Sequence, residues 1–164
     1  MFLGRPKLKV AFGVKTIEGV YNTKALVIEV SNEGIGRGWK RRLRITRETA
    51  RSVSLLAAIS VAHSGEDVFS YAPRLKRDGG EGSAGWEIDL PPTLMPATAC
   101  VALCVHEEDG LKVRLGNFQD EKRRDIGPGR YRLDLAVSSM GEHRAFSVIR
   151  EFRIGETIDT CYWS

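Results

Sequence analysis

The stretch "RYRLDLAV", residues 130–137, decides the expected fold. Every second residue in it is apolar, and three of the four residues between them are charged. The apolar residues are Tyr131, Leu133, Leu135 and Val137. Because successive side chains of a β-strand point to opposite faces, this alternation predicts a strand with one buried face and one face in water.

The same alternation recurs on both sides of this strand along the chain. The apolar sets expected to share a face are Leu8, Val10, Phe12 and Val14; Leu26, Ile28 and Val30; Val53, Leu55, Ala57, Ile59 and Val61; Trp86, Ile88 and Leu90; and Val101, Leu103 and Val105. Turn signals such as "HSGED" and "KRDGGEGSAG" separate the strands, and "SSMGE" predicts a hairpin after "RLDLAV". One alternative remains open, a helix over 46–59 with Thr46 as its cap.

These strands determine the expected architecture. About eight short strands occur, separated by turn signals at regular intervals. No helix follows each strand, as it would in a parallel sheet. A chain of 164 residues is long enough to bury one core. We therefore expect residues 1–164 to form a single all-β domain, an antiparallel β-sandwich of about seven to nine strands.

Composition and cysteine content indicate where the protein is located and whether it binds a metal. No signal peptide or membrane-spanning apolar run is visible, so we expect a protein of the cytoplasm or of the cytoplasmic face of the membrane. Cys100, Cys104 and Cys161 have no metal-binding spacing and are expected to be free buried thiols. The first two would lie about 13 Å apart on one strand, beyond disulfide reach. We expect no metal and no cofactor.

Catalytic motifs find little support in this sequence. Gly80, Gly82 and Gly85 match G-x-G-x-x-G, but they precede a strand, whereas a dinucleotide-binding loop opens a helix. No G-x-S-x-G nucleophile elbow is present. Residues 107–109 form an acidic turn that lacks the spaced ligands of a calcium loop. A site assembled in space from His63, His106 or His143 stays open.

The basic character of the protein is concentrated in one segment. The net charge is +4, yet residues 37–51 hold seven cations against the single acid Glu48. The candidate surface for an anionic partner consists of Arg37, Lys40, Arg41, Arg42, Arg44, Arg47 and Arg51. The charges are expected to coat the wet face of a strand, with Leu43 and Ile45 inward. Nucleic acid, an anionic lipid surface and an acidic protein are the alternative partners.

The order of motifs resembles a known class of domains. After "RPKL" come "VIEVSNEG", "WEIDLPP" and a closing hairpin that begins with "IGPGRYRLDL". Over residues 5–158 the chain is similar to the uncharacterised immunoglobulin-like β-sandwich domains of many bacterial and archaeal hypothetical proteins. The resemblance implies an immunoglobulin-like sandwich and carries over no catalytic residue. Relatives of this kind are often attached to membrane anchors, which this sequence lacks.

The sequence thus predicts a non-catalytic protein-interaction or assembly module rather than an enzyme, with another protein as its partner. A binder of nucleic acid or of an anionic membrane surface, acting through residues 37–51, is the alternative, and a hydrolase comes third. The identity of the partner and the oligomeric state are left open.

Overall fold

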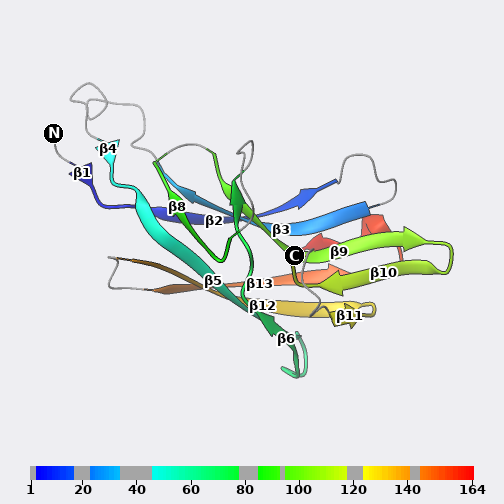
Figure 1. The fold of residues 1–164 in the computed structure, drawn as a ribbon. Helices are drawn as coiled ribbons and strands as arrows, with labels where there is room; N and C mark the ends of the chain where they lie inside the picture. Colours follow the sequence, from blue (N-terminus) through cyan, green and yellow to red (C-terminus); the bar gives the residue numbers. More distant parts are fainter. Residues whose placement is uncertain are drawn as a thin grey trace.

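The structure is a computed structural model that describes residues 3–16, 23–33, 46–77, 85–92, 95–117, 124–140 and 145–164. These residues form two antiparallel sheets that face each other as a sandwich (Figure 1). The described part of the chain contains one short 3₁₀ helix, η1 (Ile158–Thr160), and no α-helix. The helix considered over 46–59 is therefore wrong, since this region contains a short strand and most of a long one.

The first sheet has the order β11-β10-β9-β3-β2, and β7 pairs with the opposite end of β9. Its strands are β2 (Leu8–Lys15), β3 (Thr23–Asn32), β7 (Lys76–Arg77), β9 (Ala97–Glu107), β10 (Gly110–Leu115) and β11 (Arg124–Ile126). A separate pair, β1 (Leu3–Gly4) and β4 (Thr46–Arg47), is parallel.

The second sheet has the order β14-β13-β12-β5-β6, and β8 pairs with the first part of β5. Its strands are β5 (Ala50–Val61), β6 (Asp67–Tyr71), β8 (Glu87–Leu90), β12 (Gly129–Met140), β13 (Phe146–Ile154) and β14 (Tyr162–Trp163). The predicted hairpin is confirmed, because β12 and β13 pair from Gly129 opposite Ile154 to Val137 opposite Phe146.

The connectivity is that of an immunoglobulin-type Greek key. In the letters used for immunoglobulin strands, the first sheet contains the order A-B-E-D in β2-β3-β9-β7. The second sheet contains the order C′-C-F-G in β6-β5-β12-β13. The hairpin β10–β11 is inserted between strands E and F and widens the first sheet. Near the start of β12, the Tyr131 hydroxyl donates a hydrogen bond to the Gly127 carbonyl at 2.7 Å, as in the tyrosine corner of such domains.

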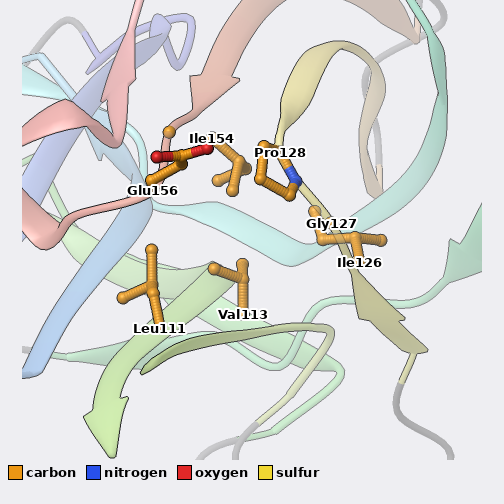
Figure 2. A pocket seen from close by; sticks show the side chains of 8 residues that line it. Leu111, Val113, Ile126, Gly127, Pro128, Ile154 and Glu156 are labelled. Carbon is orange, nitrogen blue, oxygen red and sulfur yellow. The ribbon is translucent and has the colours of Figure 1, made fainter. Parts of the chain in front are cut away.

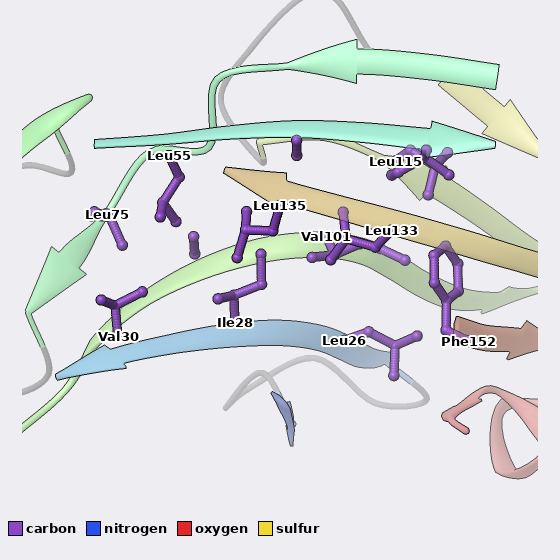
Figure 3. Packing of buried hydrophobic residues seen from close by; sticks show 14 of the residues in the cluster. Leu26, Ile28, Val30, Leu55, Leu75, Val101, Leu115, Leu133, Leu135 and Phe152 are labelled. Atoms are coloured by element: carbon purple, nitrogen blue, oxygen red, sulfur yellow. The ribbon is translucent and has the colours of Figure 1, made fainter. Parts of the chain in front are cut away.

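The core lies between the sheets and is built from the faces that the sequence pattern predicts. Leu26, Ile28 and Val30 of β3 point toward Leu133 and Leu135 of β12 (Figure 3). All five side chains are fully buried. Because β-branched and leucine side chains fill the space between two pleated surfaces, the alternating pattern was sufficient to place them.

Strand β9 departs from the predicted alternation because it contains a β-bulge. Leu26 pairs with Ala102 and Val27 pairs with Cys100, so Val101 is an extra residue in β9. The side chains beyond the bulge exchange faces. Cys104 is buried, whereas the expected core residues Leu103 and Val105 are only half-buried.

The bulge is held in place by hydrogen bonds from neighbouring elements. The Val101 carbonyl accepts from the Gly116 amide at 3.1 Å. The Cys100 carbonyl accepts from the hydroxyl of Tyr71, which comes from the opposite sheet, at 2.7 Å. Burial raises the pKa of Tyr71, so this hydroxyl keeps its proton and remains a donor. The bulge is therefore a fixed feature of the packing.

Trp86 and Val14 also depart from the prediction. Trp86 was expected on the inner face with Ile88, but it precedes β8 and is 56% exposed. Its ring lies against the guanidinium of Arg74, 4.4 Å from the ring centroid. Val14, expected on the inner face with Phe12, lies next to the end of the edge strand β2 and is 49% exposed.

Candidate functional site

The predicted basic surface falls mostly outside the described residues. Arg37, Lys40, Arg41, Arg42 and Arg44 all lie there, as do Leu43 and Ile45. The backbone of Arg47 belongs to β4 and pairs with Gly4. Arg51 is exposed in β5, where it lies opposite Met140 of β12. Arg51 is thus the only one of the seven predicted cations whose side chain the structure describes.

Among the described residues, the histidines and the acidic turn form no metal-binding cluster. His63 is exposed in the turn after β5, His106 is exposed near the end of β9, and His143 lies outside the described residues. Within the described part of the chain, no three His, Cys, Asp or Glu side chains could hold a metal ion. Glu107 pairs with Lys112 at 2.7 Å, and this hydrogen bond lowers the pKa of the Glu107 carboxyl.

The outer face of the second sheet carries exposed apolar side chains. Leu56 is 65% exposed and Ile149 is 55% exposed. They lie on β5 and β13, with β12 between them, and the register places Ala136 beside Leu56 and Ala58 two strands from Ile149. We call Leu56, Ala58, Ala136 and Ile149 the outer apolar patch. Asp134 of β12 lies directly between Ala58 and Ile149, and Ala136 lies between Leu56 and Ser147, so small residues and one carboxylate separate the two large side chains.

One end of this face is positively charged. Arg130 and Arg153 lie directly opposite each other on β12 and β13, and both are exposed. Like charges in this position repel each other. Neither forms an ion pair with another described residue, whereas the neighbouring Arg132 pairs with Asp134 at 3.3 Å. The arginine pair is thus available to carboxylates from outside.

A cavity of about 210 Å³ opens at one end of the sandwich. Figure 2 shows Leu111 and Val113 of β10 facing Ile154 and Glu156 across the opening. Ile126, Gly127, Pro128 and Gly155 complete the lining. The walls are mostly apolar, and Glu156 is the only charged residue among them.

Two thiols meet just behind this cavity. The bulge turns Cys104 of β9 inward, and Cys161 follows η1 at the carboxyl end of the chain. Both are buried and free in the same core, where β9 contacts η1, and each thiol shifts the pKa of the other. Lys24 of β3 lies opposite Cys104, and its ammonium donates to the Ile158 carbonyl at 3.3 Å. The Lys24 ammonium therefore lies near two thiols that shift each other's pKa.

Comparison with protein-family models, with curated proteins and with solved structures found no match. Among the described residues, no helix is long and apolar enough to cross a membrane.

Sequence reasoning missed both the outer apolar patch and the thiol pair. A signal for the patch was present: "SLLAA" and "SVIRE" each place two large apolar residues side by side in an alternating strand. One of the two must then face outward. No local signal marked the thiol pair, because its geometry depends on the bulge at Val101 and on where residue 161 returns to the sandwich.

Proposed function

We propose that this domain is a non-catalytic protein-interaction or assembly module that binds another protein through the outer apolar patch. The observation that carries the proposal is the exposure of Leu56 and Ile149 on one sheet face. Single exposed apolar residues are common on protein surfaces, but here two of them lie on the same sheet face with only β12 between their strands, where Ala136 and the Asp134 carboxylate separate them.

The charges around the patch specify the chemistry of the partner. Apolar centres with arginine nearby are typical of protein interfaces. Carboxylates of a partner would relieve the repulsion between Arg130 and Arg153, neither of which forms an ion pair with another described residue. We therefore propose a protein partner with a flat apolar surface and an acidic margin. The free cysteines suit a reducing compartment, which supports a cytoplasmic location.

The experiment compares three tagged proteins in extracts of the source cell. The parent is compared with the double variant Leu56→Asp, Ile149→Asp and with Val14→Asp, a control that places the same charge on an exposed apolar site of the other sheet. We expect one protein to be retained by the parent and by the control but reduced at least tenfold with the double variant. Equal retention by all three would overturn the proposal, as would the absence of both a retained protein and a self-associated form of the parent.

A second measurement identifies a partner that is another copy of the chain. Sedimentation of the purified parent over a range of concentrations would then show a dimer that the double variant abolishes. The alternative function, binding of nucleic acid or an anionic membrane through residues 37–51, is supported by the charge of that segment. It predicts binding that the double variant leaves unchanged.

A further inference from the structure

The segment that follows β13 is folded tightly around Cys161. Gly155 has no room for a side chain, since an added Cβ would overlap the Thr160 side chain. The Thr157 amide and hydroxyl both contact Thr160 Oγ1 at 3.1 Å, and the Cys161 amide donates to the Ile158 carbonyl at 3.1 Å. This short loop sets the direction in which the Cys161 side chain enters the sandwich.

The Cys161 sulfur has hydrogen-bond partners for both protonation states. As a thiol it donates to the Thr157 carbonyl at 3.5 Å. As a thiolate it accepts from the Cys104 thiol and from the Gly155 backbone. The hydrogen bond from Cys104 is the largest influence, and together with Gly155 and Lys24 it lowers the pKa of Cys161 to about 6 despite burial. The same hydrogen bond, with burial, raises the pKa of Cys104. The pair thus loses its first proton easily and its second with difficulty.

Cys100 provides an internal comparison on the same strand. It is also buried, but no hydrogen bond to a thiol lowers its pKa, which burial raises to about 12. A buried thiol without a positive neighbour is unreactive. The difference between Cys100 and Cys161 therefore arises from the partners of each sulfur and not from burial alone.

The cavity brings small molecules close to the pair. Val113, which lines it, lies opposite Cys104 in the β9–β10 ladder, and Gly155, which also lines it, contacts the Cys161 sulfur. A water molecule occupies about 30 Å³ of liquid, so a cavity of about 210 Å³ has room for a solute the size of hydrogen peroxide. Residues that line the cavity are therefore direct neighbours of both cysteines.

We propose that Cys104 and Cys161 are an oxidisable pair that hydrogen peroxide converts into an intramolecular disulfide, fastening the carboxyl-terminal segment to β9. The Cys161 thiolate attacks one peroxide oxygen, the O–O bond breaks, and the leaving hydroxide takes a proton to form water. The Cys161 sulfenic acid is then attacked by the Cys104 sulfur, which gives up its proton as the S–O bond breaks and a second water leaves. Two thiols are oxidised and one peroxide is reduced to two waters.

The disulfide would stabilise the contact of β14 with β2, which joins the edges of the two sheets. Two residues after Cys161, the Trp163 indole donates to the Gly13 carbonyl at 2.9 Å and lies against the rings of Phe12 and Phe152. In the reduced protein the two-residue strand β14 is also held by its backbone pairing with the end of β13. A covalent link at Cys161 would hold the segment in place, so oxidation is expected to raise the melting temperature.

The test treats the reduced protein with hydrogen peroxide, removes the peroxide, unfolds the protein and alkylates the remaining thiols. We expect two of the three thiols to be lost and peptide mapping without reductant to find a peptide pair that joins Cys104 to Cys161. Cys100→Ser should form the same link. Cys161→Ser, checked for folding by circular dichroism, should keep both of its thiols alkylatable.

Three results would overturn the proposal. These are three alkylated thiols after peroxide treatment, a link that includes Cys100, and oxidation of Cys161 beyond the sulfenic acid without a link to Cys104. The melting temperature gives an independent readout, since a linked protein that melts no higher than the reduced one would contradict the fastening of the carboxyl-terminal segment.

Discussion

At the scale of single residues, Leu133 lies where the sequence pattern and the core coincide. It is fully buried on β12 and pairs with Ile59 of β5 and Arg150 of β13. It comes two residues after the corner Tyr131, the position at which antibody domains carry a cysteine of their inter-sheet disulfide. Here an apolar contact joins the sheets at that point instead of a covalent bond.

Replacing Leu133 by Ala removes buried apolar volume and leaves a cavity. We expect the variant to lose about 2 to 5 kcal/mol of the free energy of unfolding while keeping a β-type circular dichroism spectrum. Urea unfolding measures this loss. Ala58→Gly, on the outer face of the neighbouring strand, removes a smaller and exposed side chain and should cost less. A Leu133→Ala variant as stable as the parent would contradict the assigned core.

Cys161 should react with a pH dependence unlike that of an ordinary thiol. Its pKa of about 6 means that thiolate already prevails at pH 7, so its alkylation rate should rise less than about twofold from pH 7 to 8 and fall below pH 6. An ordinary thiol with a pKa near 8.5 gains roughly eightfold. The charged and titratable groups that change the pKa of Cys161 are Cys104 and Lys24. The acidic residues of its own segment, Glu156 and Asp159, are exposed.

Residue-resolved mass spectrometry after brief alkylation measures these rates. Cys100, with a pKa raised to about 12, is the internal control and should gain about tenfold for each pH unit. Equal pH dependence at Cys100 and Cys161 would show that the hydrogen bond from Cys104 does not govern the reactivity of Cys161.

At the scale of elements, the turn from β13 through η1 to β14 depends on one glycine. Gly155→Ala would drive a methyl group into Thr160, so either η1 or the end of β13 must shift. We expect a lower urea midpoint and a weaker contact between Trp163 and Gly13, seen as a change in tryptophan fluorescence. Gly127→Ala is the matched control, because its added Cβ meets nothing within 4 Å. Similar effects of the two variants would contradict this role for Gly155.

Buried asparagines connect elements in a way that no strand pattern indicates. Asn32, at the end of β3, accepts from the Lys7 amide and donates to the carbonyls of Glu48 and Leu90. Asn117 accepts from the Arg74 amide and donates to the Ala72 carbonyl. Each satisfies backbone groups of segments distant in the sequence, which is why these polar side chains are buried without an unpaired amide.

At the scale of the whole molecule, the concentration of charge in residues 37–51 allows a direct test against the alternative function. We expect no saturable binding to short DNA, RNA or anionic vesicles tighter than about 10 μM at physiological ionic strength, because non-specific affinities lie near that value or weaker. Fluorescence anisotropy with labelled oligonucleotides and vesicle co-sedimentation measure it.

The variant Arg42→Glu, Arg44→Glu is the control for this measurement. It should leave the circular dichroism spectrum unchanged and alter little besides solubility. Binding by the parent below 10 μM, with a steep salt dependence that the variant removes, would instead establish the basic segment as the working surface.

The sequence by itself determined the main strands and, except beyond the bulge in β9 and at Trp86, the side of each that is buried, because the alternation of apolar and polar residues acts locally. Leu26, Ile28, Leu133 and Leu135 could be placed in the core for that reason. The same rule contained the signal for the outer apolar patch in the paired apolar residues Leu55–Leu56 and Val148–Ile149.

Only the tertiary structure decided which residues meet across the sandwich. Val101 becomes an extra residue in β9 only because β3, β10 and Tyr71 of the opposite sheet supply its hydrogen-bonding environment, and this turns Cys104 inward. Cys161 reaches Cys104 because the chain returns through Gly155 and η1. Such contacts join residues far apart in the sequence, and their energy depends on the packing of both sheets, which no local pattern of residues encodes.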